Sequence, residues 1–293
     1  MPSAEDRSAR SIWNRREALA ALVTLPAVAF ATRSGQTPFD ALERLHGGRL
    51  GIAALDTGSG KALTHRAGER FPMCSTFKLI AVSAVLARAD HGEERLDRHI
   101  AYGPADLVDP APVTRAHVRG GRLTMEELCA AAIEYSDNTA ANLLLRELGG
   151  PQGATRFARS LGDEKTRIDR MEPMANTCIP GDPRDTTTPS AMLVDLQNLT
   201  LRNALSIASR SRLIAWLANC KTKFPRIPAG LPAGWRSGNK MGTGSYGTSN
   251  DVAILWPPRR APILVAAYYT GSDAPSTARD AVLAEVGRRV AAL

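Results

Sequence analysis

The chain has 293 residues, of which 44% are hydrophobic and 23% charged, and its formal net charge is +8 at pH 7. This composition excludes a disordered tail or a fibrous protein and is typical of a globular protein with one large core or two lobes that share one. The sequence has no Lys/Arg-rich run and no zinc-finger spacing. We therefore expect no nucleic-acid partner and interpret the charge as attraction to small anions or as plain solubility.

The N-terminal segment has the features of an export signal. Two arginines, Arg15 and Arg16, precede a short apolar run that ends with an Ala-Phe-Ala triplet at 29–31. This order predicts a signal peptide over residues 1–31 and a periplasmic mature protein over residues 32–293. The paired arginines favour the twin-arginine route but also occur in ordinary secretory signals. The apolar run is too short to cross a bilayer, which needs about 18–20 residues, so we expect no membrane span in the mature protein.

Hydrophobic periodicity then predicts the elements of the mature chain in order. A helix over 38–46 precedes two strands, 49–55 and 62–66, which are separated by the turn at 57–60. From about residue 75 to residue 219 the spacing is mostly helical, and the clearest helices are 77–89, 125–134, 139–147 and 190–198. Strand patterns return at 235–241, 249–256 and 261–269. A last amphipathic helix follows at about 276–292.

Strands at the two ends of the chain must pair with each other to bury their apolar faces. We therefore predict an α/β (α+β) fold with one antiparallel five-stranded sheet flanked by the terminal helices and an all-helical lobe. The sheet lobe is assigned to residues 32–70 and 221–293, and the helical lobe to residues 71–220. A groove between two lobes is a common place for a small-molecule site, so we expect the active site there.

Three short motifs carry candidate chemistry. Ser75 and Lys78 lie three residues apart and share one face at the start of an apolar helix. A serine hydroxyl becomes a good nucleophile when a neighbouring base, such as a lysine of lowered pKa, takes its proton. The pair alone is weak evidence for a catalytic site, because serine is a common helix cap and lysine is a common helix residue.

The second motif is Ser136-Asp137-Asn138, between two helical runs, and it also has the composition of a helix cap. The third, Lys240-Met241-Gly242-Thr243-Gly244, starts as a strand and turns into glycine. Its lysine suits an anionic substrate, although a lysine on an edge strand also guards against aggregation.

The order S-x-x-K, S-D-N and K-T-G is the signature of class A β-lactamases and penicillin-binding proteins, and here the third motif departs from it only at Met241. From Phe39 to its C-terminal helix the sequence resembles the class A serine β-lactamases. The segment 168–176 resembles the Ω-loop of that family, in which a glutamate and an asparagine, here Glu172 and Asn176, hold the deacylating water. Penicillin-binding transpeptidases lack this glutamate, so its presence favours hydrolysis.

The resemblance implies a catalytic set of Ser75, Lys78, Ser136 and Glu172. Ser75 would attack the lactam carbonyl, Ser136 would relay a proton to the departing nitrogen, and Glu172 would activate the water. Whether Lys78 or Glu172 takes the proton of the serine is disputed for the family. The backbone N–H groups of Ser75 and Thr243 would hold the oxyanion.

The substrate-binding residues implied by the resemblance are Asn138, Asn176, Arg226, Lys240 and Thr243. Arg226 could also be a solvated loop arginine. The partner would be a β-lactam antibiotic, and we expect a monomer that uses no cofactor and no metal.

Four departures from the family pattern concern the groove. Met241 replaces a hydroxyl residue that ordinarily helps to bind the substrate carboxylate, so we expect weaker binding. Pro110 and Ala175 replace an aromatic residue and a leucine, which should widen the cleft or loosen its wall. Gly244 stands where one subgroup has the disulfide partner of Cys74.

The remaining cysteines and the histidines give no metal pattern. Cys74, Cys129, Cys178 and Cys220 lie far apart without a C-x-x-C spacing, and all five histidines are isolated. Four cysteines allow three complete pairings, and we expect Cys129 to be a buried free thiol.

The resemblance also implies that an ion pair of Arg170 and Asp185 braces the Ω-loop, although the two residues could equally form an ordinary surface pair worth less than about 1 kcal/mol. Two other functions stay open: a D-alanyl-D-alanine peptidase or serine esterase with the same Ser75, and a non-catalytic β-lactam-binding domain.

Overall fold

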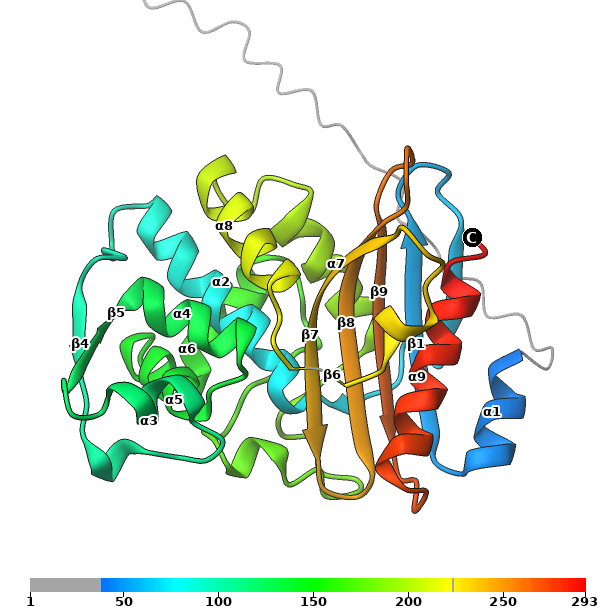
Figure 1. Cartoon of the computed structure of the whole chain (residues 1–293), viewed down its shortest axis with the longest axis horizontal. Helices are drawn as coiled ribbons and strands as arrows, with labels where there is room; N and C mark the ends of the chain where they lie inside the picture. Colours follow the sequence, from blue (N-terminus) through cyan, green and yellow to red (C-terminus); the bar gives the residue numbers. More distant parts are fainter. Residues whose placement is uncertain (1–37, 223) are drawn as a thin grey trace, which may run out of the picture. The chain divides into compact units, whose positions relative to one another are not determined.

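The structure is a computed structural model that describes residues 38–222 and 224–293, all of which belong to the unit Gly35–Leu293. Five strands form one antiparallel sheet in the order β2-β1-β9-β8-β7 (Figure 1). Their bounds are β1 (Arg49–Asp56), β2 (Ala62–His65), β7 (Arg236–Gly244), β8 (Thr248–Trp256) and β9 (Ile263–Thr270). Because β1 pairs with β9 along its whole length, the predicted closure of the sheet by both ends of the chain is confirmed. The predicted signal peptide lies outside the described residues.

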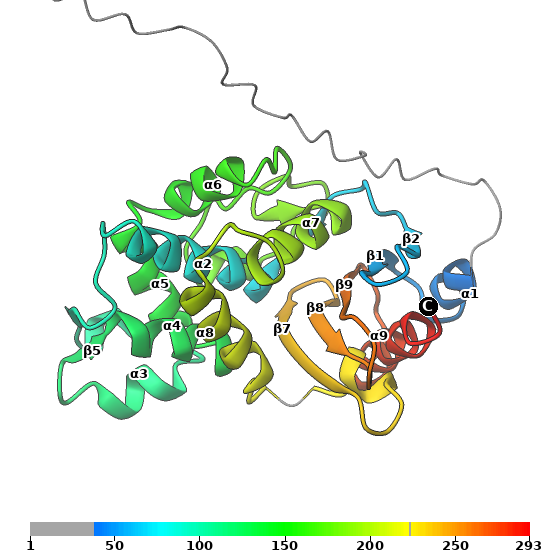
Figure 2. The same ribbon diagram turned by 90° about the horizontal axis from the view of Figure 1, so that it is seen from above.

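Two terminal helices cover one face of the sheet. Helices α1 (Pro38–His46) and α9 (Ser276–Val290) lie side by side there, as Figures 1 and 2 show. Phe39 and Leu283 belong to the apolar core of this layer, together with residues of β1, β8 and β9. Strands β8 and β9 are buried on both faces, which explains why their sequences are nearly continuous apolar runs.

The other face of the sheet lies against the helical region. One apolar core joins the two, because it contains Ile80 and Leu144 from helices and Ile254, Leu264 and Tyr268 from the sheet. The helices that build this region are α2 (Phe77–Asp90), α3 (Pro112–His117), α4 (Met125–Glu134), α5 (Asn138–Glu147), α6 (Pro151–Ser160), α7 (Pro189–Thr200) and α8 (Ile207–Ala218). Two short ladders complete it, β3 (Phe71–Pro72) with β6 (Thr186–Thr187) and β4 (His99–Ala101) with β5 (Arg122–Thr124).

Helix α2 is the central element of the helical region. Its residues from Phe77 to Ala87 are all buried, so it has no polar face toward solvent. A helix that is buried all round must be packed against neighbours on every side. The N-terminal end of α2 is therefore held in a fixed place, and this end carries the first motif.

Strand β7 is longer than predicted, because it continues through the glycines to Gly244. The glycines indicated a turn, but the structure gives them another role. A Cβ at Gly242 would lie 2.7 Å from the carbonyl oxygen of Met73. The missing side chain lets β7 approach the segment that carries Ser75.

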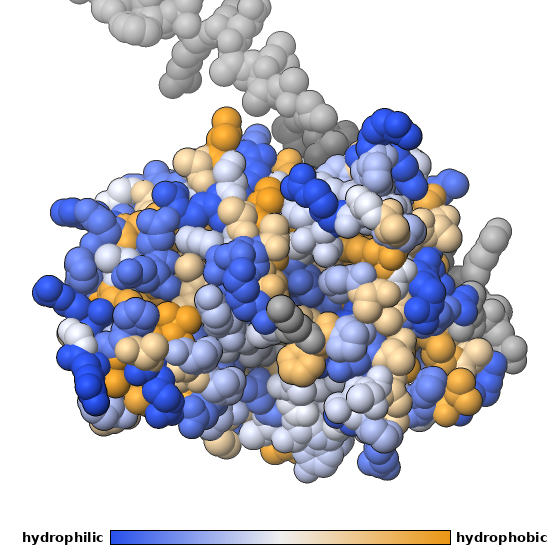
Figure 3. All heavy atoms as spheres, in the orientation of Figure 1, coloured by the Kyte–Doolittle hydropathy of each residue, from blue (hydrophilic) through white to orange (hydrophobic). Residues whose placement is uncertain are grey.

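The surface drawn in Figure 3 mixes hydrophilic residues with small apolar patches. In the described part of the chain, no helix combines the length and the apolarity that crossing a membrane requires.

We expect the two faces of the sheet to unfold together because they share the sheet. Replacing Leu145, fully buried in α5, by alanine should lower the free energy of unfolding by about 2–5 kcal/mol. Leu45→Ala on α1, where the side chain is 75% exposed, is the control and should change the free energy by less than about 0.5 kcal/mol. Far-UV circular dichroism and tryptophan fluorescence should report one common midpoint for each protein, and two separate midpoints would contradict a single cooperative unit.

Candidate active site

Ser75 lies in a short 3-10 turn, Cys74–Thr76, directly before α2. The turn is held from two sides: Thr76 Oγ1 donates to the carbonyl of Met73, and the amide of Asn250 on β8 donates to the carbonyls of Pro72 and Met73. Ser75 Oγ donates to Glu172 Oε1 at 3.4 Å. The hydroxyl is therefore presented by a fixed backbone next to a carboxylate.

Lys78 follows one turn later and its side chain is fully buried. Its ammonium donates to the carbonyl of Ser136 at 2.8 Å and to Asn138 Oδ1 at 2.6 Å, and it lies 3.3 Å from Glu172 Oε1. Burial lowers the pKa of Lys78, and the charge of Glu172 opposes this shift. The first motif is thereby connected to the second and to the loop of Glu172.

The second motif divides into two roles. Asp137 caps α5, since its carboxylate accepts from the N–H of Ala140, and it also accepts from Thr114. The interpretation as a helix cap is therefore right for Asp137. Ser136 has a φ of +57° and its Oγ accepts from Lys240 Nζ at 3.0 Å, while the Nδ2 of Asn138 donates to the carbonyl of Asp109. The cap thus holds Ser136 and Asn138 beside two lysines.

Lys240 reaches the site from β7, and its side chain is fully buried. Its ammonium donates to Ser136 Oγ and to the carbonyl of Met241. Burial, and then repulsion by Lys78, lower the pKa of Lys240 to about 7. The alternative of an exposed lysine that protects a sheet edge is wrong.

The Glu172 loop, residues 168–185, brings its carboxylate to the same place. Asn142 on α5 fixes the backbone of Glu172, because its amide accepts from the N–H and donates to the carbonyl. The second carboxylate oxygen of Glu172 accepts from Asn176 Nδ2. Within the described residues, Asn176 Oδ1 is buried and has no hydrogen-bond partner. The loop therefore presents a fixed carboxylate and an open acceptor side by side.

The expected brace of this loop is confirmed. Arg170 Nε donates to Asp185 Oδ2 at 2.5 Å, and Asp185 Oδ1 accepts from the backbone N–H groups of Asp169 and Arg170. In return Asp169 accepts from the N–H of Asp185. Because the Asp185 side chain is only 3% exposed, this is a buried network rather than an ordinary surface pair.

Arg226 is buried, so its alternative as a solvated loop arginine is wrong. Its guanidinium pairs with Asp280 of α9 at 2.7 Å and donates to the carbonyls of Gly242 and Asn250. The remaining nitrogen donates to Thr243 Oγ1 at 2.7 Å. Arg226 therefore acts on the groove through Thr243.

These side chains surround a groove of about 330 Å³. Its lining includes Ser75, Ser136, Asn138, Asn176 and Thr243, together with Pro110 and Met241. Two cavities of about 750 and 570 Å³ lie elsewhere, and neither has a residue of the three motifs in its walls. We assign the site to the smaller groove because the reactive groups converge there. Ala175, which was expected to widen the cleft or loosen its wall, does not line the groove; it is buried in the apolar core.

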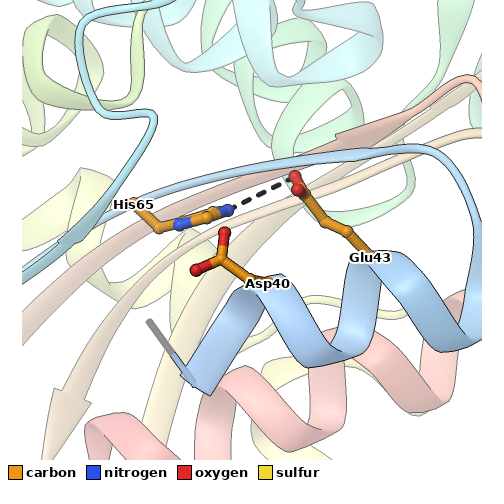
Figure 4. A group of neighbouring side chains, drawn as sticks. All are labelled: Asp40, Glu43 and His65. Atoms are coloured by element: carbon orange, nitrogen blue, oxygen red, sulfur yellow. Dashed lines mark ion pairs between the residues drawn. The ribbon is translucent and has the colours of Figure 1, made fainter. Parts of the chain in front are cut away.

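One group of three possible metal ligands occurs in the described residues, formed by Asp40, Glu43 and His65 (Figure 4). Glu43 already accepts from the guanidinium of Arg66 and from the N–H of Leu50, and it pairs with His65. A guanidinium in this place disfavours a cation. The group is best explained as an ion-pair cluster that attaches α1 to the sheet.

The cysteines agree in part with expectation. Cys129 is a buried free thiol as predicted, and burial raises its pKa. Cys74 is also free, but its Sγ lies 3.2 Å from the Sγ of Cys178. No sequence signal pointed to this pair.

Asn142 and Asn250 were also missed as positioning residues, because a single asparagine in a helix or strand has no distinctive spacing.

We predict that the brace is needed for the stability of the loop. Asp185→Ala removes the acceptor of two backbone N–H groups and of a guanidinium, so the free energy of unfolding should fall by about 3–5 kcal/mol, measured by urea denaturation. Limited proteolysis should then cut within residues 168–185. Asp97→Ala, which breaks the exposed pair with Arg95, is the control and should leave the denaturation midpoint unchanged. Equal midpoints for Asp185→Ala and the parent protein would contradict the role of the brace.

The chain is similar to known enzymes over most of its length. A family model described as the beta-lactamase enzyme family matches residues 36–293. β-Lactamase CTX-M-25 of Escherichia coli is 48% identical over 255 residues, which cover 87% of each chain. β-Lactamase AST-1 of Nocardia asteroides is 47% identical over 270 residues, which cover 92% of this chain and 87% of that one.

Solved structures agree. An ancestral class A β-lactamase named GNCA is 59% identical, with a TM-score of 0.84 and coverage of 86% of this chain and 96% of that one. The putative class A β-lactamase PenP from Rhodopseudomonas palustris is 53% identical, also with a TM-score of 0.84, and the match covers 86% of this chain and 97% of that one. With the three motifs and the glutamate loop gathered in one groove, the chain belongs to the class A serine β-lactamase family.

Proposed function

We propose that this enzyme hydrolyses β-lactam antibiotics through an acyl-enzyme on Ser75, which water activated by Glu172 then hydrolyses. The family supports the hydrolysis of β-lactams. One observation supports the finer mechanism most strongly. The carboxylate of Glu172 contacts Ser75, Lys78 and Asn176 at the same time, so a single base can serve both half-reactions.

In the acylation step, Ser75 Oγ attacks the lactam carbonyl carbon and loses its proton. The contact of Ser75 Oγ with Glu172 Oε1 favours the carboxylate as the acceptor, directly or through a water. Lys78 contributes its charge beside the same oxygen. The backbone N–H groups of Ser75 and Thr243 are proposed to hold the oxyanion, and one such donor typically contributes about 3–4 kcal/mol.

The departing lactam nitrogen needs a proton, and Ser136 is proposed to supply it. Ser136 Oγ accepts from Lys240 Nζ at 3.0 Å and from Lys78 Nζ at 3.4 Å. A hydroxyl that accepts from two ammonium groups leaves its own proton free to point into the groove. Either lysine can then restore the proton.

Substrate binding is proposed to use both walls of the groove. The carboxylate of the drug would bind Lys240 and Thr243, and Arg226 would orient the hydroxyl of Thr243. Asn138 would bind the side-chain amide of the drug from the opposite wall, and Asn176 would bind at the edge of the loop. This division suits an anionic bicyclic molecule with a polar side chain.

In the deacylation step, a water bound between Glu172 and Asn176 would attack the ester. Asn176 Oδ1 is an open acceptor next to the carboxylate, and a water that donates to both would be oriented toward Ser75. Of the alternatives from sequence, a non-catalytic binding domain needs no deacylating base, and the match of Glu172 to the glutamate of the class A family disfavours a D-alanyl-D-alanine peptidase or a serine esterase. We also propose that the protein is exported to the periplasm through its signal segment and acts as a monomer.

The proposed function is tested by the turnover of a chromogenic cephalosporin by the purified full chain. We expect steady hydrolysis that is lost in Ser75→Ala, because no other hydroxyl occupies its place. A single stoichiometric burst without turnover would support the non-catalytic alternative instead.

The position of Met241 in the groove leads to a prediction about substrate binding. Its side chain lines the groove where a hydroxyl would reach the substrate carboxylate. Met241→Thr should lower KM for benzylpenicillin by roughly tenfold or more, because a hydrogen bond to a charged group contributes about 1.5–3 kcal/mol. Met241→Val has the shape of threonine without the hydroxyl and should not show this gain. The same decrease in both variants would contradict a carboxylate site at β7.

The lowered pKa of Lys240 predicts a pH dependence. The free enzyme loses the charge of Lys240 as the pH rises through about 7, so kcat/KM for an anionic β-lactam should fall above that pH. The effect should be in KM, because a bound carboxylate raises the pKa of Lys240. Lys240→Arg keeps its charge and should move the fall to higher pH. An unchanged pH profile in this variant would exclude Lys240 as its cause.

A further inference from the structure

We propose that Cys74 and Cys178 form a disulfide bond that joins the turn of Ser75 to the Glu172 loop when the protein meets a disulfide oxidant. The proposal concerns the covalent structure of the protein and does not depend on the proposed mechanism. Its consequence for the site does rest on that mechanism, because the bond would connect the nucleophile to the segment of the deacylating base.

The geometry supports this pairing. The two sulfur atoms lie 3.2 Å apart, and both side chains are buried at the contact of the 3-10 turn with the loop. A disulfide has an S–S distance of about 2.0 Å, so the sulfurs need to approach by only about 1.2 Å. Both residues have positive φ angles, +48° at Cys74 and +51° at Cys178. Each side chain therefore leaves the backbone in a direction that a regular helix or strand does not allow.

Strand β7 leaves room for the two sulfurs. A Cβ at Gly244 would lie 2.5 Å from the Sγ of Cys178 and 2.7 Å from the Sγ of Cys74. Any side chain at this position would therefore push between the thiols or displace one. In one subgroup of the family, the counterpart of Cys74 is bonded to a cysteine at the position of Gly244. Here the glycine at this position leaves the space in which the sulfur of Cys178 reaches the sulfur of Cys74.

The other cysteines of the described chain do not compete. Cys129 is buried among apolar residues of the helical core, and Cys220 contacts Thr222. In the part of the chain that the structure describes, neither of them forms a hydrogen bond with Cys74 or Cys178, and these two lie 104 residues apart in sequence. Among the described residues, Cys74 and Cys178 are the two cysteines whose sulfur atoms are already in contact, so the structure favours the one complete pairing that contains this pair.

An oxidant can reach one of the thiols. Cys178 lines a cavity of about 570 Å³ whose wall also carries Arg49, Arg70 and Arg184. The hydrogen bond between the two thiols lowers the pKa of Cys178 and raises that of Cys74, so Cys178 is the more acidic thiol of the pair and the better candidate to attack as a thiolate. The arginines favour an anionic oxidant such as glutathione disulfide.

The reaction then balances as a thiol–disulfide exchange. The Cys178 thiolate attacks one sulfur of glutathione disulfide, the S–S bond of glutathione breaks, and one glutathione thiolate leaves. Cys74 loses its proton to this thiolate or to solvent, and its sulfur attacks the mixed disulfide at Cys178. The second glutathione leaves, so the two protein thiols are oxidised and one glutathione disulfide is reduced to two thiols.

The test is to oxidise the purified full chain with glutathione disulfide, block the remaining thiols by alkylation, and map the peptides by mass spectrometry. We expect one cross-linked pair that contains Cys74 and Cys178, with Cys129 and Cys220 alkylated. The oxidised protein should melt on the order of 5–10 °C higher than the reduced protein, because the bond closes a long loop. Recovery of Cys74 and Cys178 on separate peptides after oxidation would overturn the proposal.

Two variants sharpen the test. Cys74→Ser leaves Cys178 without its resolving thiol, so Cys178 should retain one glutathionyl group. Cys220→Ser is the matched control and should keep both the cross-link and the increase in melting temperature. An equal increase in Cys178→Ser would show that another bond causes it and would also overturn the proposal. Because peptide mapping needs no antibiotic, its result is independent of whether the enzyme hydrolyses β-lactams.

Discussion

The buried ion pair of Lys78 and Glu172 is the constraint on which the rest of the site depends. Both side chains are fully buried, and removing two charges from water costs several kcal/mol per ion unless their remaining hydrogen-bonding groups are satisfied. The carbonyl of Ser136 and the amides of Asn138 and Asn176 supply those partners. The second motif and the glutamate loop can therefore be understood as the environment that this pair requires.

A site built around buried charges needs rigid supports, and these come from both faces of the sheet. On one side Asp137 and Asn142 hold α5 and the loop in place. On the other, the buried pair of Arg226 and Asp280 connects α9 to Thr243 at the groove. The position of a terminal helix is thus coupled to strand β7, which is proposed to bind the substrate, and this explains how a chain closed by its two ends would suit the proposed chemistry.

Much of this could be predicted from sequence, because the deciding signals are local. The helix over 125–134 and the strands of the sheet follow from hydrophobic spacing, and S-x-x-K with S-D-N identifies the groove. The misses arise where distant segments meet. The glycines of β7 indicated a turn because their reason, the close approach of the Ser75 segment, lies far away in sequence. Arg226 in a polar loop showed no sign that Asp280 would bury it, and nothing in the spacing connected Cys178 with Cys74.

The central claim is that Glu172 serves the hydrolysis of the acyl-enzyme, and intact-mass measurement of Glu172→Ala with benzylpenicillin tests it most directly. Ser75 remains in this variant, and Lys78 is then the base left to take its proton, so a penicilloyl adduct should still form, although more slowly than in the parent protein. General-base assistance typically contributes 10²- to 10⁴-fold, so we expect deacylation to slow by about that factor and the adduct to persist while the parent protein returns to its unmodified mass. Turnover by Glu172→Ala at the parent rate, or a parent protein that itself stays acylated for hours, would contradict the account.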